Sequence, residues 1–495
     1  MPILGWLKGP AQADVDVSDW EEYPVHLNDG CKLNHKVMGW AMRFDSVLDA
    51  EKLHSALVRL LELGHWRRLG GRLRRDQHGQ LRIYVPKVFT ATHPAVQYQR
   101  SVISQPIAAH PIGSQFIKTT CEPSIQPLEK DLRYFMAPED FPESIDGLVQ
   151  TDKAQLALVV TSFDDATLVS IAFPHTLLDG NGFVNLVQNW SLVLAGKEDE
   201  VAPFLGPQID ALEDLVAADT SALKPEDCRM EKMRIKGFAL WKYLGRQMAE
   251  AVQRKRRLQA LYIPQATYRK LLEKFREEGS VLEVNEADER RREDEAHVLT
   301  AWLIKTIAAQ ESAPRPVTLL TLYDLRDHIR ALKDASQRGN FAQGLVTSSC
   351  AMFPAGTHQT PIGDLVRAYK EQVAALTTEE EALAFMKQWR SELRKKKPDV
   401  ALYGSTDSLL VFYDPVAKLD PAKMADFGPA VMATSGGDET SPGRISGNVF
   451  NPLDWTDAGV DLLLPLGHDY EGGYWITAKL STASWNSVAQ QLRDL

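Results

Sequence analysis

Residues 167–196 read TLVSIAFPHTLLDGNGFVNLVQNWSLVLAG, and this stretch decides the fold. Its first seven residues are mostly apolar or β-branched and end at Pro174, which predicts a buried strand. After Gly182, apolar residues recur at helical spacing as far as Gly196, a residue type that commonly ends helices. The segment is therefore expected to form a strand, a tight turn that contains His175, and a helix.

The flanking sequence extends this pattern toward the N-terminus. Residues 155–163 form a second apolar run that Asp164 and Asp165 separate from the first, which predicts a β-hairpin. Residues 49–63 carry leucines at helical spacing behind Asp49, a suitable N-cap. Residues 70–85 predict a further hairpin that turns at 77–79.

The C-terminal half mixes the same two kinds of element. Its predicted helices cover residues 296–309 and 362–376, its predicted strands cover 317–325, 409–412 and 460–464, and the charged run 278–295 is expected to be a solvated loop. Strands and helices thus alternate throughout the chain. The expected class is α/β or α+β.

A chain of 495 residues is too long for one ordinary core, so two domains are expected. The pattern weakens between residues 201 and 237, where three prolines and several acidic residues occur. We therefore expect an N-terminal domain over residues 1–200, a crossover linker over 201–237, and a C-terminal domain over 238–495.

Composition excludes several function classes. The formal net charge of -10 argues against a nucleic-acid-binding protein, which would normally carry a basic surface. The four cysteines form no CxxC pair, which favours reduced thiols in a cytoplasmic protein over disulfides or a zinc site. The sequence shows no signal-peptide pattern and no apolar run near the roughly 20 residues that cross a bilayer. The expectation is a soluble, cytoplasmic protein without a membrane partner.

The turn after the predicted strand carries the clearest candidate for chemistry. A histidine at a strand end suits a general base, because its pKa lies near working pH. Asp179 follows His175 by four residues, beside Gly180, and could hold the loop that aims the imidazole. Two plainer interpretations stay open: Asp179 as the N-cap of the following helix, and His175 as an ordinary loop histidine.

Other catalytic signatures do not occur. A metal site would need a third ligand beside His175 and Asp179, and no HExxH motif or Cys/His cluster supplies one. The chain has no GxSxG, Walker or GxGxxG motif. Asp426-Phe427-Gly428 matches the DFG of protein kinases, but no glycine-rich loop or HRD motif precedes it.

Taken together, the motifs resemble those of the BAHD acyltransferase family, with loop lengths similar to those of its fungal secondary-metabolite members. The family's HxxxDG motif is matched by His175, Asp179 and Gly180; its D-x-R…G-N segment by Asp324, Arg326, Gly339 and Asn340; and its DFGWG motif, in part, by Asp426, Phe427 and Gly428. The three motifs occur in the family's order, and the resemblance covers the chain from about Val25 to Leu492.

The resemblance implies two chloramphenicol acetyltransferase-like domains joined by a crossover loop, with a tunnel between them. By the family pattern His175 is the general base, and Asp179 turns away from the reaction to pair with Arg326. Gly180, Asp426 and Gly428 would support the site structurally. The implied protein is a monomer with no metal and no bound cofactor, and acyl-CoA, most simply acetyl-CoA, is its co-substrate.

The implied function is acyl-CoA-dependent transfer of an acyl group to a hydroxyl or amine of a small-molecule, secondary-metabolite acceptor. One alternative is a carrier-protein-dependent condensation catalyst, although such domains usually have a second histidine where this chain has Pro174. Another is a non-catalytic binding protein on the same fold. It is motivated by Pro429-Ala430, which replace the family's Trp-Gly; Pro429 has no N–H to donate to an oxyanion.

Overall fold

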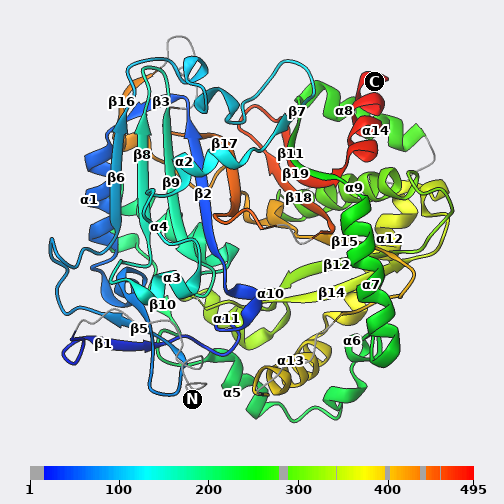
Figure 1. The fold of residues 1–495 in the computed structure, drawn as a ribbon, viewed down its shortest axis with the longest axis horizontal. Helices are drawn as coiled ribbons and strands as arrows, with labels where there is room; N and C mark the ends of the chain where they lie inside the picture. The colour runs from blue at the N-terminus through cyan, green and yellow to red at the C-terminus, as the bar shows by residue number, and fades with distance from the viewer. Residues whose placement is uncertain (1–15, 278–287, 342, 396–401, 435–441, 457–458) are drawn as a thin grey trace, which may run out of the picture.

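Two mixed sheets form the two halves of the molecule in the computed structural model, which describes residues 16–277, 288–341, 343–395, 402–434, 442–456 and 459–495 (Figure 1). The five-stranded sheet has the order β17 (Ile445–Pro452), β2 (Val37–Phe44), β9 (Thr167–Pro174), β8 (Ala157–Ser162) and β6 (Gln97–Val102). The seven-stranded sheet has the order β14 (Val346–Phe353), β12 (Val317–Asp324), β15 (Leu409–Tyr413), β18 (Asp461–His468), β19 (Tyr474–Ser481), β11 (Arg256–Ile263) and β7 (Ser124–Pro127). The predicted mixed class with two domains is confirmed.

Helices cover both sheets. In the first half α1 (Ala50–Leu60) packs against α4 (Gly180–Leu194), and α2 (Arg133–Met136) contacts β2, β8 and β9. In the second half α9 (Asp288–Ala308) packs against α12 (Ile362–Leu376) and α14 (Thr482–Arg493). The other α-helices of the described residues are α3 (Ile145–Gln150), α5 (Ala211–Ala218), α6 (Arg229–Lys232), α7 (Gly237–Gln253), α8 (Gln265–Glu277), α10 (Leu325–His328), α11 (Arg330–Ser336) and α13 (Glu379–Leu393).

The local predictions around the deciding segment are confirmed. β8 and β9 form the expected antiparallel hairpin, with Ser162 opposite Thr167 at its closed end. The Asp49 side chain accepts hydrogen bonds from the backbone of Glu51 and Lys52, so it caps α1 as expected. β4 (Arg72–Arg75) and β5 (Leu81–Val85) form the second predicted hairpin and, with β1 (Glu21–Pro24), a small separate sheet.

The prediction of a solvated loop over residues 278–295 is wrong for its second part. Residues 278–287 lie outside the described residues, but α9 already begins at Asp288. Its charged first turns are stabilised by partners from distant segments: Lys370 binds Asp294, and His468 contacts Glu295 at 2.9 Å. Because Glu and Arg also have high helix propensity, a charged run with such partners forms a helix.

The two halves exchange strands. β7 lies beside β11 in the seven-stranded sheet, although it comes from the N-terminal part of the chain. β17, drawn in orange in Figure 1, pairs with β2 among the N-terminal strands. The indole N–H of Trp40 on β2 donates to Asn448 on β17 at 3.1 Å. Each half therefore needs part of the other to complete its sheet.

The expected linker over residues 201–237 contains ordered elements. β10 (Phe204–Leu205) pairs in parallel with β13 (Asn340–Phe341), and α5 contacts α13. Leu212 on α5 is fully buried. The segment thus contacts both halves, since Phe204 also packs against Trp66 of the first half. The boundaries at residues 200 and 237 stay a prediction.

The segment around Phe427 ties the C-terminal half to the core of the first half. The Phe427 ring is fully buried, with its centroid 5.2 Å from that of Phe44 and 4.6 Å from that of Trp190. β16 (Val431–Thr434) then pairs with β3 (Ser46–Leu48). Of the DFG-like residues, Phe427 therefore packs the C-terminal half against the core of the first half.

We predict that Phe427→Ala lowers the free energy of unfolding by about 3–5 kcal/mol, the usual cost of an aromatic-to-alanine cavity. Met432→Ala in the same segment is the control, because that side chain is 64% exposed and should change stability by less than about 0.5 kcal/mol. Thermal unfolding of both variants checks this. Equal melting temperatures would show that Phe427 does not join the halves.

Candidate active site

His175 lies at the point where β9 leaves its sheet. Its backbone N–H donates to the carbonyl of Lys36 at 2.8 Å, so the residue is still tied to the neighbouring strand. The backbone N–H of Leu177 then donates to the carbonyl of Pro174 at 2.9 Å, which turns the chain toward α4. These two bonds fix the position from which the imidazole projects.

The Asp179 carboxylate both caps α4, which is one of the interpretations that the sequence left open, and pairs with Arg326, as the resemblance implies. One carboxylate oxygen, Oδ1, accepts from the backbone N–H of Gly182 at 2.7 Å and caps α4. The other, Oδ2, accepts from Nη1 and Nη2 of Arg326, each at 3.0 Å, and from the backbone N–H of Leu345 at 3.1 Å. The ion pair that the resemblance implied is thus present, and it crosses between the two halves.

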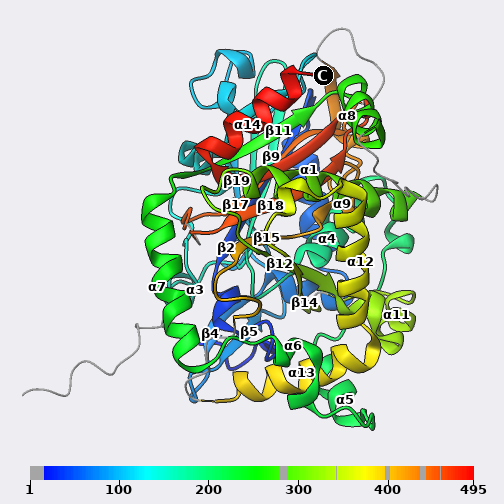
Figure 2. The same cartoon turned by 90° about the vertical axis from the view of Figure 1, so that its right-hand side faces the viewer.

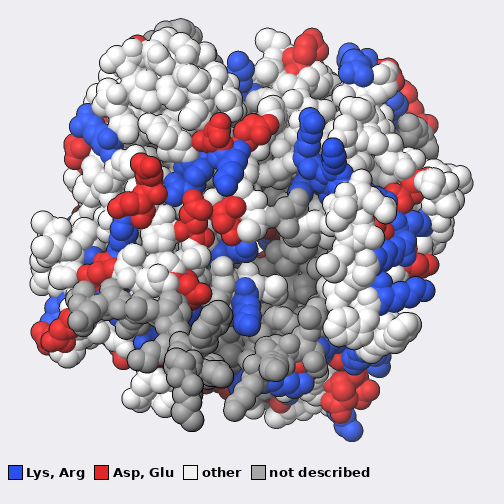
Figure 3. Space-filling model, viewed as in Figure 1, with Lys and Arg blue, Asp and Glu red and all other residues white. Residues whose placement is uncertain are grey.

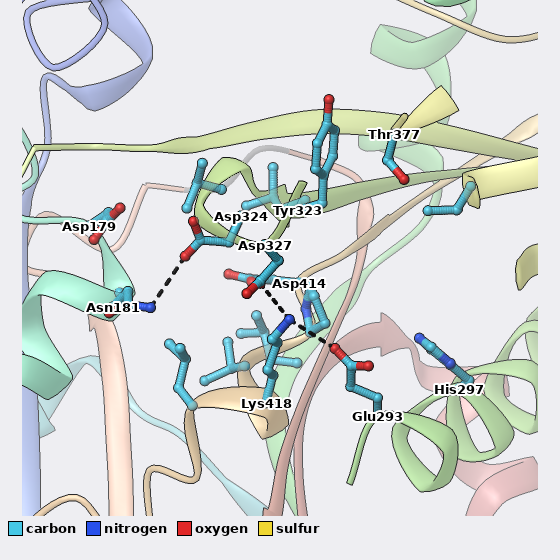
Figure 4. A pocket seen from close by; sticks show the side chains of 18 of the residues that line it. Asp179, Asn181, Glu293, His297, Tyr323, Asp324, Asp327, Thr377, Asp414 and Lys418 are labelled. Atoms are coloured by element: carbon cyan, nitrogen blue, oxygen red, sulfur yellow. Dashed lines mark hydrogen bonds and ion pairs between the residues drawn. The ribbon is translucent and has the colours of Figure 1, made fainter. Parts of the chain in front are cut away.

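The Arg326 guanidinium forms further hydrogen bonds near the end of β12. Its guanidinium donates to Asp324 at 2.8 Å and to the backbone carbonyl of Gln343 at 2.9 Å. The Asn181 amide, one residue into α4, donates to Asp324 at 3.3 Å (Figure 4). A charge buried without its partner costs about 3–5 kcal/mol, so this network holds the start of α4 against the other half.

A cavity of about 630 Å³ lies between the halves in front of His175. Its wall is predominantly apolar, with Leu322, Val346, Leu464 and Leu466 from the seven-stranded sheet and its flanking residues. Gly180 lines it as well, and a Cβ at this position would approach Leu419 Cδ1 to 3.2 Å, so a side chain there would crowd the entrance to α4. The volume and character suit a small organic molecule.

The His175 imidazole is placed to act as a base. Burial lowers its pKa below the ordinary value of 6.5, and interactions with its own backbone and with Asp179 offset this only in part. The ring is therefore neutral at pH 7. Because Nδ1 is buried, Nε2 is the nitrogen that can reach the cavity.

Polar groups that the sequence did not reveal also line the cavity (Figure 4). Lys418 binds Glu293 at 3.1 Å and Asp327 at 2.5 Å, and these two carboxylates raise its pKa in spite of its burial. Asp414 follows β15 and also faces the cavity, and burial raises the pKa of its carboxyl to about 7. Of these polar residues, only Asp327 is adjacent in sequence to a motif residue, Arg326, so the sequence offered no signal for the others.

The other predicted supporting residues lie elsewhere. Asp426 is exposed and pairs with Arg444 at 3.1 Å, and its carboxylate accepts from the backbone N–H of Gly428 at 3.2 Å. Neither residue lines the cavity. The carbonyl of Pro429 accepts from Lys52 on α1 at 2.6 Å, so the segment that departs from the family motif rests on the first half, away from His175.

Two kinds of feature are missing from the part of the chain that the structure describes. None of its helices combines the length and apolar character needed to span a bilayer. Nor does any group of three or more His, Cys, Asp and Glu side chains there have the arrangement of a metal site. On the face shown in Figure 3, Lys and Arg side chains are interspersed with Asp and Glu.

Comparison with known sequences identifies a family and full-length relatives. The sequence model of the Transferase family matches residues 113–411. The chain is 28% identical to the O-acetyltransferase PaAT-2 of Phomopsis amygdali, over 95% of this chain and 97% of that protein. It is 29% identical to the acetyltransferase pyiB of Pyricularia grisea, over 96% of this chain and 94% of that protein.

Solved structures share the fold at low identity. TRI101 of F. sporotrichioides, crystallised with coenzyme A and T-2, superposes with a TM-score of 0.60 at 10% identity and covers 95% of this chain and 97% of its own. Vinorine synthase superposes with a TM-score of 0.54 at 12% identity and covers 97% and 93%. The two-domain architecture of these proteins is therefore that of the present chain.

We predict that Asp179 and Arg326 act as one structural unit. Arg326→Met should destabilise the protein by about 3–5 kcal/mol, because it strands the buried carboxylate of Asp179. Asp179→Asn should cost less, because Arg326 keeps Asp324 as a partner. The double variant should lose less than the sum of the two, since Asp179 is then no longer a stranded charge and only Asp324 lacks its partner. Melting temperatures measured beside activity check this, and strictly additive losses would mean that the pair is not coupled.

Proposed function

The chain belongs to the Transferase family of acyltransferases, and on this basis we propose that it transfers an acetyl group from acetyl-CoA to a hydroxyl or amine of a small-molecule, secondary-metabolite acceptor. The observation that carries the proposal is a neutral His175 held at the wall of a cavity of about 630 Å³ between two domains. The acetyltransferases among the relatives and the coenzyme A complex of TRI101 support the donor.

In the proposed reaction His175 acts as the general base. Nε2 takes the proton of the acceptor hydroxyl or amine as its oxygen or nitrogen attacks the thioester carbonyl. The carbon–sulfur bond then breaks, and the proton passes from the imidazolium to the departing thiolate, so that free coenzyme A and the acylated acceptor leave. Asp179 and Arg326 keep the ring in position and touch neither substrate.

Direct transfer in a ternary complex fits the cavity. Covalent relay would need a nucleophile beside the base, and none of the four cysteines lines this cavity. Binding donor and acceptor next to one imidazole lowers the activation barrier, because the reacting groups are already oriented. In well-aligned systems this effect is worth roughly 7–11 kcal/mol. The proposed mechanism uses one base and two bound substrates, and none of its steps needs a metal.

The charges of the cavity favour an uncharged or basic acceptor. Apart from Asp414, the charged residues of the wall are paired: Lys418 with Glu293 and Asp327, Lys370 with Asp294, and Asp179 and Asp324 with Arg326. Asp414 also lines the wall, and no cationic partner for it lies among the described residues. Because its pKa is about 7, Asp414 is partly ionised at neutral pH, and a carboxylate on the acceptor would be repelled by the ionised form. We therefore expect neutral alcohols or amines to be better acceptors than acids.

We predict that His175→Ala lowers kcat by about 10²–10⁴-fold and leaves coenzyme A binding nearly unchanged, because the base is lost but the donor contacts remain. Thiol release from acetyl-CoA, measured with a panel of hydroxylated natural products, gives the rates, and calorimetry gives the affinity for coenzyme A. The control is His78→Ala, which removes an exposed histidine of the hairpin turn. Retention of more than about a tenth of the activity by His175→Ala would refute the assignment.

A further inference from the structure

Helix α7 presents an apolar side to solvent. Phe238, Trp241, Met248 and Val252 are 85%, 73%, 72% and 84% exposed. Their spacing places them on one side of the helix, and we call these four residues the α7 stripe. In Figure 2 α7 stands at the left edge of the molecule.

The buried side of α7 carries Tyr243 and an ion-pair network around Glu250. Glu250 is 8% exposed and accepts hydrogen bonds from Arg246 at 3.1 Å and from Arg315, beyond the end of α9, at 2.8 Å. Arg254, just after α7, binds Glu311. Turning the stripe inward would bury Phe238 and Trp241 but break these ion pairs. The polar contacts therefore fix the orientation that leaves the stripe exposed.

An exposed apolar row of this kind marks an interaction surface, since single monomers rarely leave such contiguous patches uncovered. The charges around it identify the partner. Between Lys232 and Arg257 the sequence holds nine Lys and Arg residues and one acidic residue, Glu250, within a chain whose net charge is -10. Five of the nine cations pair with carboxylates: Arg234, Lys236, Arg246, Arg254 and Arg256. Lys242, Lys255 and Arg257 are exposed near the stripe and form no ion pair with the described residues.

A helix with Phe and Trp on its outer side and flanking cations has the character of a segment that lies in a membrane interface. We propose that α7 docks this protein on an anionic lipid bilayer, with the α7 stripe in the headgroup region and the flanking lysines against lipid phosphates. The helix does not span the membrane: it has 17 residues, and Lys242 interrupts its outer side. The absence of a spanning segment, on which the expectation of no membrane partner rests, does not bear on binding of this kind.

Flotation of the full chain with vesicles tests the proposal. Wild-type protein should float with vesicles of phosphatidylcholine and phosphatidylserine in a three-to-one mixture, bind pure phosphatidylcholine vesicles much more weakly, and be released by added salt. The double variant Phe238→Ser/Trp241→Ser should reduce the bound fraction at least tenfold with an unchanged melting temperature. The control is Val88→Ser/Met432→Ser, which removes two side chains that are 71% and 64% exposed elsewhere and should float like wild type.

Three results would overturn the proposal. One is the absence of wild-type flotation with either vesicle. Another is equal flotation of the two double variants. The third is a homodimer, seen by sedimentation equilibrium, that the Phe238→Ser/Trp241→Ser variant converts to monomer while vesicles bind neither form. That result would assign the stripe to a second copy of the chain.

Discussion

The buried ion pair between Asp179 and Arg326 is the constraint on which the rest of the site depends. Asp179 begins the helix that follows His175, and Arg326 follows the last residue of β12 in the other half. Arg326 donates to Asp324 and to the chain after β13 as well, so one guanidinium fixes three segments. Because these three segments border the cavity, their fixed separation sets the width of the cavity. It also sets the orientation of the His175 imidazole.

The rest of the architecture reinforces this contact. β7 and β17 each complete the sheet of the opposite half, and Phe427 inserts between Phe44 and Trp190. Lys418 joins Glu293 on α9 to Asp327 on α10 across the cavity wall. The halves are thus interlocked by strands, by an aromatic cluster and by ion pairs. The cavity lies between the two halves and is lined by side chains from both.

The sequence predicted what local patterns determine. The hairpin before His175, the capped helix α1 and the position of Asp179 all follow from spacing over fewer than about twenty residues. The pairing of Asp179 with Arg326, 147 residues apart, was expected only because the motifs resemble those of a family. Asp414 and Lys418 could not be recognised, since neither has a local signature and both acquire their setting through the fold.

The errors have the same origin. The charged run before residue 296 was expected to be a loop, because the partners that stabilise it as a helix, Lys370 and His468, lie far away in sequence. The apolar residues of α7 recur at helical spacing, so that a helix could have been predicted there. The side of α7 that faces solvent could not be predicted, because Glu250 is held by Arg315, which comes from another part of the chain.

The central claim, that a buried and neutral His175 is the base, is tested most directly by the pH dependence of kcat/KM. Protonation removes the base, so activity should fall as pH falls, and because burial lowers the pKa of His175 the midpoint should lie below 6.5. A neutral acceptor and the Asp414→Asn variant separate this limb from titration of the second cavity carboxyl. A midpoint clearly above 6.5 in that variant, or a rate that does not fall toward acidic pH, would contradict the account.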